Sequence, residues 1–431
     1  MIAHIITYLR KRQGKEDKMR YHERFGIASE FALQKLDEYK RFCKENNLEP
    51  KVIWIHAVSV GESLSVLDFV KKIINKNYFV VFTTTTMTSA EILKSKLLKN
   101  AVHQYCAFHS KRYIEKFLNT WKPISVFFVE NEIFPSTVRL LYKRKIPFYI
   151  INARMSDRSF KLWKIIKFYI KPLLRRYSCI FALSEQERDK FQILSDNKAN
   201  VKSFGNLKFD MAISNKLALE KEFNNCASRE IVKCKLLRET YKDKKIIVFG
   251  SIHSKEFFYV LWQYSMMLKK INCIGIFVPR YINESNALEK LALGSNFNPI
   301  YWDDLKNDDN NKKKEENLII VNKMNILQSL YKVCDVAVVC GSFADGIGGH
   351  NPIESVVFGK PTFVGKYCSK SQDLIDQLLL GNVIIQTMNL CENILPFISD
   401  EKKKNKLEND VNSFFKKHEN VSEKIINYIN L

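Results

Sequence analysis

The chain has 431 residues, of which 46% are hydrophobic and 27% are charged. That length and balance are typical of a soluble globular protein with two domains, and they exclude a disordered chain and a polytopic membrane protein. With 69 Lys and Arg against 46 Asp and Glu, the formal net charge is +23. Such an excess favours anionic partners, namely nucleic acid, an anionic bilayer or phosphorylated substrates.

The ten cysteines are scattered singly, with no CxxC pair and no Cys/His group at zinc-ligand spacing. This usage predicts free thiols in a reducing, cytosolic compartment and no metal site. The start, MIAHIITYLRKR, is too short to span a bilayer, and its charges follow the apolar run, unlike those of a cleavable signal. A short interfacial anchor remains the alternative for this segment.

Short β-branched or aromatic runs alternate with longer helix-patterned segments throughout the chain. The runs span residues 51–58, 78–85, 124–130, 148–153, 179–184, 245–251, 273–279, 318–322, 336–342 and 361–365. Alternating strands and helices predict βαβ units and parallel sheets covered on both faces, so the fold class is α/β.

This alternation pauses between about 207 and 244, in a polar, helix-prone stretch. We place the domain boundary near its start, which gives domains of residues 1–207 and 208–431. Two doubly wound domains joined there are expected to leave a cleft between the carboxyl ends of their strands. The charged segment 306–317 is predicted to be a solvated loop. The helix-patterned C-terminus is expected to pack back on the first domain.

Glycine is concentrated in one segment, GSFADGIGGHNPIESVVFGKPTFVG, where six of the 14 glycines fall between residues 341 and 365. It follows an apolar strand and precedes a helix pattern, so its main-chain N–H groups are expected to bind phosphate or carboxylate. Asn351 suits the N-cap and Pro352 the first helical position. Glu354, one turn in, is placed to accept ribose hydroxyls. A tight turn followed by a well-capped helix is the alternative.

Acidic residues follow two predicted strands in the first half of the chain. Glu62 opens a helix in HAVSVGES, and Gly61 beside it permits close approach of a ligand. Glu62 is either a general base or a first-turn charge stabilised by the helix dipole. Glu130 ends the strand in FFVENEIFPS and should face the crevice, as a partner of Glu62 or of an arginine. We interpret His56 as a hydrogen-bonded strand-end histidine rather than a ligand.

Basic residues mark two further places in this half. Arg154 and Arg158 are four residues apart, which predicts one helix face that holds a phosphate or carboxylate, or else an ordinary ion-paired face. In the helix expected over 161–176, KLWKIIKFYIKPLLRR, cations recur between apolar residues. This pattern suits either an anionic membrane surface or the solvated face of a packed helix.

Polar residues also end two strands of the second half. Ser251 and His253 lie in GSIHSKE, and Arg280 lies in VPRYINE. Both places are expected to contact the phosphate or base of a nucleotide. A structural ion pair is the alternative for Arg280.

Eight segments occur in the order found in the Kdo (3-deoxy-D-manno-octulosonic acid) transferases of lipopolysaccharide assembly, which the chain resembles from about residue 50 to 370. They are HAVSVGE, TTTTMTSAE (83–91), VENEIFPS, NARMSDRSF, GNLKFD (205–210), GSIHSKE, VPRYINE and GGHNPIE (348–354). One such motif alone is weak evidence for a family, whereas eight motifs in the same order are specific for it. The resemblance implies a GT-B glycosyltransferase, with two Rossmann-like domains facing across a cleft, the acceptor half first and the CMP-sugar half second.

The resemblance also implies the reaction and its residues. Kdo moves from CMP-Kdo to a tetra-acylated lipid A precursor with inversion, and neither a metal nor a cofactor takes part. Glu62 matches the general base, and Glu130 matches a second essential acidic position. The donor site corresponds to Ser251, His253, Arg280, Gly348, Gly349, His350, Asn351 and Glu354, and acceptor or junction positions to Ser59, Gly61, Arg154, Arg158 and Lys208.

A protein of this family is expected on the cytoplasmic face of the bacterial inner membrane, peripheral or monotopic, with the anionic membrane surface as a partner. Two residues depart from the family pattern: Tyr281 stands where His is usual, and Asn325 replaces a Gly. The rival interpretations are a GT-B transferase that uses a UDP-sugar and a catalytically silent protein that binds lipid or sugar nucleotide. A nucleic-acid-binding role rests on charge alone, because no RNP, helix-turn-helix or zinc motif is present.

Overall fold

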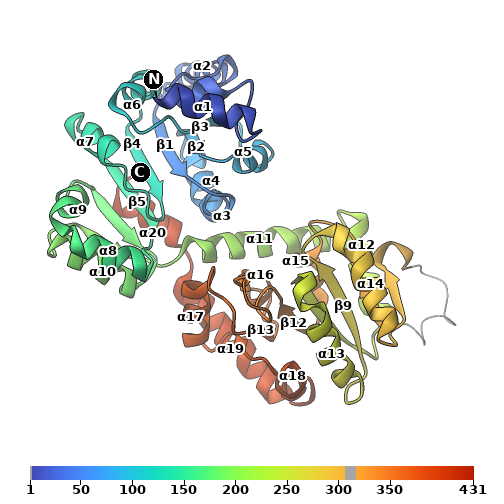
Figure 1. Cartoon of the computed structure of the whole chain (residues 1–431). Helices are drawn as coiled ribbons and strands as arrows, with labels where there is room; N and C mark the ends of the chain where they lie inside the picture. Colours follow the sequence, from blue (N-terminus) through green and yellow to red (C-terminus); the bar gives the residue numbers. More distant parts are fainter. Residues whose placement is uncertain (1, 306–316) are drawn as a thin grey trace. The chain divides into compact units, whose positions relative to one another are not determined.

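The computed structural model describes residues 2–305 and 317–431, so the predicted loop at 306–317 lies outside the described residues except for its last position. The chain divides into two compact units, Met1–Met211 with Asn420–Leu431, and Ala212–Glu419. Each unit is a parallel sheet covered by helices (Figure 1). The predicted α/β class with two doubly wound sheets is therefore confirmed.

The first unit is built on a seven-stranded sheet in the order β3-β2-β1-β4-β5-β6-β7. Its strands are β1 (Val52–Ala57), β2 (Phe79–Thr84), β3 (Ala101–Tyr105), β4 (Ser125–Val129), β5 (Phe148–Ala153), β6 (Cys179–Ala182) and β7 (Val201–Ser203). Its helices are α1 (Ile2–Arg12), η1 (Tyr21–Phe25), α2 (Glu30–Glu45), α3 (Val60–Ser65), α4 (Leu67–Asn75), α5 (Met87–Lys94), α6 (Lys111–Trp121), α7 (Pro135–Lys143), α8 (Asp157–Ile165), α9 (Lys167–Leu174), α10 (Glu185–Ser195) and α20 (Val421–Tyr428).

Alternation along β1 shows why this sheet is buried on both faces. Val52 and Trp54 belong to one apolar cluster, whereas Ile53 and Ile55 belong to the cluster on the opposite face. Successive side chains of a strand point to opposite sides, so an unbroken apolar run needs cover on both. Helices packed on each face supply that cover.

The second unit repeats the design with the strand order β10-β11-β9-β8-β12-β13-β14. Its strands are β8 (Lys245–Ile252), β9 (Cys273–Pro279), β10 (Pro299–Tyr301), β11 (Leu318–Ile320), β12 (Val336–Val339), β13 (Thr362–Val364) and β14 (Ile385–Gln386). Its helices are α12 (Arg229–Thr240), η2 (Ser254–Glu256), α13 (Phe257–Leu268), η3 (Ile282–Glu284), α14 (Ser285–Gly294), η4 (Trp302–Asp304), α15 (Leu327–Val333), α16 (Ile353–Val356), α17 (Gln372–Leu380), α18 (Leu390–Ser399) and α19 (Glu401–His418).

The long helix α11 (Leu207–Asn224) begins in the first unit and ends in the second. Near its start the buried Asp210 accepts hydrogen bonds from the main-chain N–H groups of Val421, at 3.1 Å, and Ser422, at 2.6 Å. A carboxylate at a helix start satisfies N–H groups that have no partner within the helix. Asp210 thus holds α20, the last helix, in the first unit.

The helix expected over 161–176 is wrong in one respect, because the chain forms two helices there. Ile166 leaves the helical region, with φ −105° and ψ 39°, between α8 and α9. Ile170, Leu173 and Leu174 of α9 are buried in the core, whereas α8 has no buried residue. Only the second half of the segment therefore packs against the core of the first unit.

Both sheets reverse their winding order once, between β1 and β4 in the first unit and between β8 and β12 in the second. In open α/β sheets, ligands bind outside the carboxyl ends of the strands at such a reversal. The segments that follow these four strands include Glu62, Glu130, His253 and the glycine-rich turn, and Ser251 lies near the end of β8. None of the described helices is long and apolar enough to cross a membrane.

Candidate functional site

Glu62 lies in the first turn of α3, directly after β1. Its carboxylate accepts hydrogen bonds from the main-chain N–H of Val58, at 2.7 Å, and from Ser59 Oγ, at 2.9 Å. Ser59 Oγ in turn accepts from the Glu62 N–H at 3.3 Å. Ser59 is thus the N-cap of α3, and the bonds from Val58 and Ser59 fix the Glu62 side chain in one orientation. Both roles foreseen for Glu62 therefore remain open, since a capping carboxylate can also take a proton.

Glu130 follows β4 and is 6% exposed, with a left-handed backbone of φ +65°. Its carboxylate pairs with Arg154, with 2.7 Å between Oε2 and Nε. Burial is the main cause that raises the pKa of Glu62, and the charge of Glu130 raises it further. Hydrogen bonds from Val58 and Ser59 act in the opposite direction. The strand ends thus bring the two predicted carboxylates close enough to repel each other.

A third carboxylate joins this pair. Burial, followed by the charges of Glu62 and Glu130, raises the pKa of Glu132 to about 7. The sequence offered a signal for Glu132, because it stands two residues after Glu130 in the same acidic turn. The first unit therefore carries a cluster of three carboxylates, Glu62, Glu130 and Glu132, at its strand reversal.

Arg154 and Arg158 do not share a helix face, which corrects the sequence expectation. Ser156 caps α8 by accepting a hydrogen bond from the Ser159 N–H at 3.2 Å, so the helix begins at Asp157 and Arg154 precedes it. Arg154 faces the carboxylate cluster, whereas Arg158 is exposed on α8. The Lys208 N–H donates to Asn206 Oδ1 at the start of α11.

Gly61 is exposed on α3, beside Glu62. A Cβ atom added there meets no heavy atom within 4 Å, and no positive φ requires glycine at this position. Nothing in the described part of the chain therefore demands glycine at position 61. The expected close approach of a ligand stays a prediction.

In the second unit a buried carboxylate, Glu256, ties the loop after β8 to the loop after β12. It accepts hydrogen bonds from the N–H groups of Gly341, at 2.7 Å, Phe343, at 2.8 Å, and His253, at 3.2 Å. Two amides of the glycine-rich turn are therefore already bonded to protein. The amides of Gly348 and His350 have no hydrogen-bond acceptor among the described residues.

His253 and His350 join these two loops from the solvent side. Their Nε2 atoms lie 2.8 Å apart, so one ring donates its N–H and the other accepts. Burial lowers the pKa of His350 to about 4, with further lowering by His253, Arg280 and Lys370. Burial also lowers the pKa of His253, the charges of Glu256 and Glu284 raise it in part, and Arg280 and Lys370 lower it. A neutral histidine pair beside two cations is an environment suited to an anion.

Lys370 is a residue of this site that sequence reasoning missed. Its N–H donates to the Gly348 carbonyl at 2.9 Å, and a Cβ at Gly348 would lie 2.7 Å from the Lys370 side chain. Gly348 and Gly349 have φ angles of +97° and +79°, which favour glycine. Lys370 comes from the segment after β13, so only the fold brings it to the turn.

The helix after the glycine-rich turn is shorter than its sequence pattern predicts. α16 spans only Ile353–Val356, and Asn351 Oδ1 accepts from the Ile353 N–H at 3.0 Å, so Pro352 precedes the helix. Glu354 is partly buried, and burial raises its pKa while Gln328 and Arg280 lower it. The positive charge of Arg280, which follows β9, therefore acts on Glu354.

Ser251 and Tyr281 complete the group. Ser251 has φ +56° at a register irregularity between β8 and β9, a distortion that can redirect a side chain. The Tyr281 ring meets His253 edge-on at 5.7 Å. Asn325, the other departure from the family pattern, has φ +64°, a conformation that Asn adopts more readily than most residues, so it substitutes for glycine without difficulty.

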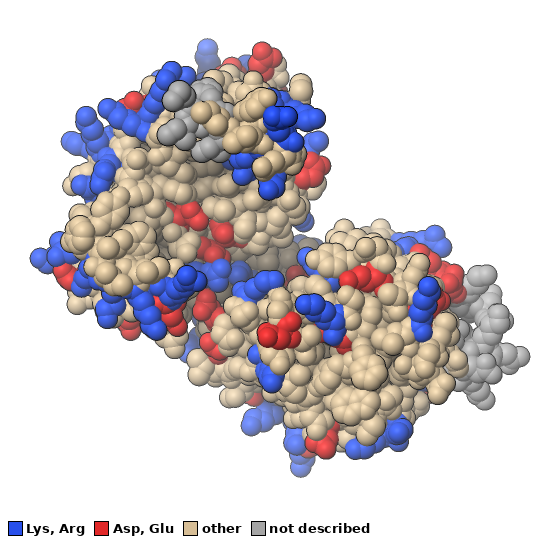
Figure 2. Space-filling view, viewed as in Figure 1, with Lys and Arg blue, Asp and Glu red and all other residues tan. Residues whose placement is uncertain are grey.

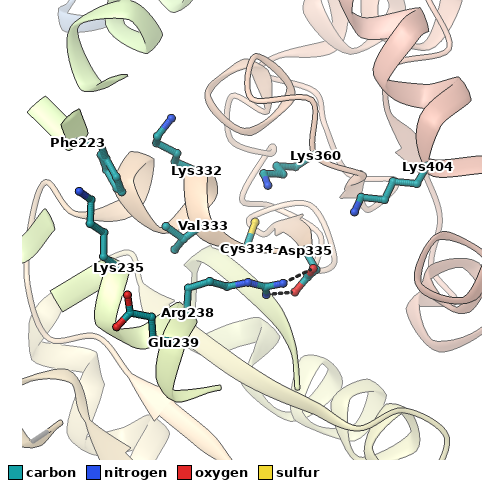
Figure 3. A pocket seen from close by; sticks show the side chains of 10 residues that line it. All are labelled: Phe223, Lys235, Arg238, Glu239, Lys332, Val333, Cys334, Asp335, Lys360 and Lys404. Atoms are coloured by element: carbon teal, nitrogen blue, oxygen red, sulfur yellow. Dashed lines mark hydrogen bonds and ion pairs between the residues drawn. The ribbon is translucent and has the colours of Figure 1, made fainter. Parts of the chain in front are cut away.

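A pocket of about 500 Å³ in the second unit lies away from this group (Figure 3). Asp335, which precedes β12, accepts from the Ile246 N–H near the start of β8, so the pocket lies at the amino ends of these strands. Its lining includes Lys235, Arg238, Lys332, Lys360 and Lys404. The pocket is therefore distinct from the strand ends that hold the candidate site.

The raised pKa of Glu132 predicts how stability responds to pH. The folded chain keeps the Glu132 proton up to pH about 7, whereas an unfolded glutamate loses it near about 4.3, so stability falls as pH rises through this window. After allowance for solvent screening, Glu132→Gln is expected to raise the free energy of unfolding by about 1–2 kcal/mol at pH 8. At pH 4.5 the same substitution is expected to change the free energy of unfolding only a little. Urea denaturation at both pH values, with Glu45→Gln as control, measures this. An equal gain at both pH values would contradict the assignment.

Comparisons with known proteins identify the family of the chain. Residues 19–211 match the model of the family described as 3-deoxy-D-manno-octulosonic-acid transferase (kdotransferase). The 3-deoxy-D-manno-octulosonic acid transferase of Rickettsia bellii is 30% identical over 415 residues, covering 95% of this chain and 90% of the relative. The enzyme of the same name from Haemophilus influenzae is 28% identical and covers 77% and 74%.

Among solved structures, the UDP-GlcNAc 2-epimerase from Neisseria meningitidis bound to UDP-GlcNAc matches with a TM-score of 0.59 at 15% identity, over 88% of this chain and 99% of the epimerase. At that identity the likeness shows the fold alone, the two-domain GT-B architecture. The sequence matches settle the family. The chain belongs to the 3-deoxy-D-manno-octulosonic acid (Kdo) transferases and is a glycosyltransferase of lipopolysaccharide biosynthesis.

Proposed function

We propose that the chain transfers Kdo from CMP-Kdo to a tetra-acylated lipid A precursor, with inversion at the anomeric carbon and no metal ion in the transfer step. The observation that carries this proposal is the contrast between the two strand reversals. One gathers carboxylates, which can act as bases. The other gathers cations, neutral histidines and amides that have no acceptor in the described part of the chain, and these groups can hold an anionic donor.

On the donor side, the CMP phosphate and the Kdo carboxylate are both anions. Arg280 and Lys370 supply positive charge, and the N–H groups of Gly348 and His350 supply directional donors. Glu354 is proposed to accept the ribose hydroxyls. Because Glu256 fixes the main chain at Gly341 and Phe343, the turn is held in shape before the donor arrives, which lowers the cost of binding.

On the acceptor side, Glu62 is proposed to be the general base. It removes the proton of the acceptor hydroxyl as that oxygen bonds to the anomeric carbon, while the bond from this carbon to the CMP phosphate breaks and CMP leaves. Burial and the charge of Glu130 raise the pKa of Glu62, which makes its carboxylate a stronger base. The capping bonds from Val58 and Ser59 hold the carboxylate in place.

Glu130 and Glu132 have supporting roles in this proposal. Glu130 forms an ion pair with Arg154, and the charge of Glu130 acts on Glu62. Glu132 changes its protonation near pH 7, so the negative charge around Glu62 depends on pH in the physiological range. Ser59, Gly61, Arg158 and Lys208 stay predicted acceptor or junction residues.

We also propose that α8 and the start of α9 dock on the anionic inner-membrane surface, as a peripheral contact on the cytoplasmic face. Three apolar side chains stand in solvent there: Leu162 is 57% exposed, Ile165 77% and Phe168 79%. A helix without a buried residue, flanked by lysines such as Lys161 and Lys164, has the composition of an interfacial helix.

The cations that recur in the helix expected over 161–176 contribute to this docking only in part. Lys167, Lys171 and Arg175 turn toward Asp196, and the bonds from the two lysines lower the pKa of that carboxyl to about 2. Lys and Arg side chains are spread over the visible face of both units rather than gathered in one patch (Figure 2). Charge alone therefore does not mark the membrane surface, and the exposed apolar side chains carry the argument.

The function is tested by incubating the purified chain with CMP-Kdo and lipid A precursor and weighing the product by mass spectrometry. The product is expected to gain the mass of at least one Kdo, and a UDP-sugar offered instead is expected to give none.

Arg280→Ala is expected to weaken CMP binding about 10–100-fold, because one hydrogen-bonded charge is lost. A well-folded chain that adds no Kdo, or that uses the UDP-sugar, would refute the proposal.

Membrane docking is tested by cosedimentation with vesicles that contain anionic lipid. The double variant Ile165→Ser/Phe168→Ser is expected to bind at least about 10-fold more weakly, because two apolar side chains no longer enter the interface. The matched control is Leu380→Ser, which changes a side chain that is 78% exposed on the other unit. Equal binding by the double variant and the wild type would place the membrane contact elsewhere.

A further inference from the structure

Three potential metal ligands meet in the first unit, apart from the carboxylate cluster. They are His56 near the end of β1, Cys106 directly after β3, and His109 before α6. One ligand atom of each lies within 4.8 Å of the other two. His56 and Cys106 are buried, and His109 is half-buried. Sequence spacing does not reveal this group, because its first member comes from a strand about 50 residues before the others.

Each histidine is held by a threonine hydroxyl on its outer nitrogen. His56 Nδ1 lies 2.9 Å from Thr83 Oγ1, and His109 Nδ1 lies 2.9 Å from Thr137 Oγ1. Metal-binding histidines commonly bind the ion through one nitrogen while the other donates to such a partner, which fixes the tautomer. In both rings the remaining nitrogen, Nε2, is therefore the one free to face a ligand.

The hydrogen bonds around Thr83 favour one tautomer of His56. Thr83 Oγ1 accepts the indole N–H of Trp54, at 2.8 Å, and donates its only proton to the Ile55 carbonyl, at 3.3 Å. With Thr83 donating to Ile55, His56 Nδ1 donates to Thr83 and His56 Nε2 presents a lone pair. This lone pair is buried and has no partner among the described residues.

An unpaired buried acceptor is costly, and it points to a ligand that is missing from the group. The expectation that His56 is a fully hydrogen-bonded strand-end histidine is therefore met at one nitrogen only.

We propose that His56, Cys106 and His109 bind one divalent transition-metal ion of the Zn²⁺ type. Two imidazoles and one thiolate suit Zn²⁺ or Co²⁺, whereas Mg²⁺ and Ca²⁺ prefer oxygen ligands. His109 Nε2 lies 3.5 Å from Cys106 Sγ, which is about the separation of a nitrogen and a sulfur ligand in a tetrahedral zinc site.

Metal binding changes the protonation of one residue. Burial raises the pKa of Cys106 to about 12, with a contribution from Glu132, so the free thiol is protonated. The ion displaces that proton to solvent as the metal–sulfur bond forms, and the neutral histidines release none. The site joins β1 to the segments after β3 and does not depend on the proposed transfer reaction. Without metal, the same atoms form a thiol–imidazole hydrogen bond.

The test is a Co²⁺ titration of the full chain carrying Cys226→Ser, which removes the exposed thiol. One Co²⁺ is expected to bind per chain, with a thiolate-to-cobalt charge-transfer band and one proton released, and Zn²⁺ should displace it. Cys106→Ser should abolish the band, and His109→Gln should weaken binding at least about 100-fold. Thr137→Val, which removes an outer partner, should weaken it about 10–100-fold.

Cys43→Ser is the matched control, since Cys43 is another buried thiol of the first unit and should leave the titration unchanged. The proposal is overturned if the Cys226→Ser chain takes up no stoichiometric Co²⁺. It is also overturned if the charge-transfer band persists in Cys106→Ser or if His109→Gln binds normally. Should Cys106→Ser fail to fold, the proton release and the His109→Gln and Thr137→Val titrations still decide.

Discussion

A doubly wound parallel sheet must reverse its strand order, and this constraint governs where chemistry can occur in both units. The connections on either side of β1 and of β8 leave in opposite directions, so the loops there diverge and expose their polar groups. The acidic segments after β1 and β4 meet at one reversal. The loops after β8 and β12, tied together by Glu256, meet at the other.

The two reversals have opposite electrostatic character. In the first unit, the charge of Glu130 helps to raise the pKa of Glu62, the charges of Glu62 and Glu130 help to raise that of Glu132, and Arg154 pairs with Glu130. In the second, Arg280 and Lys370 stand beside a histidine pair that burial keeps neutral. Glycosyl transfer between two anionic partners needs a base on one side and anion binding on the other. The proposed mechanism assigns one requirement to each unit.

The sequence predicted the strands that are apolar on both faces, because their runs need no long-range information. It missed β3, β7, β10 and β14, which are short or contain polar residues such as His103 and Gln104. Glu62, Glu130 and the glycine-rich turn were predictable, because each directly follows a strand. Three other features could not be predicted: Glu256, Lys370 and the His56–Cys106 group. Their roles depend on partners about 50 or more residues away in sequence, or on loops that only the fold brings together. Arg154 and Arg158 were misplaced because a serine cap starts α8 later than the spacing implied.

The central claim is that Glu62 removes the acceptor proton. The most direct measurement is the single-turnover rate of Kdo transfer by Glu62→Gln with both substrates saturating, alongside its affinity for CMP. The account predicts a rate that is about 10²–10⁴-fold lower, with CMP affinity unchanged, because glutamine keeps the shape of the side chain and loses the basic oxygen. A Glu62→Gln chain that transfers Kdo at the wild-type rate would contradict the account.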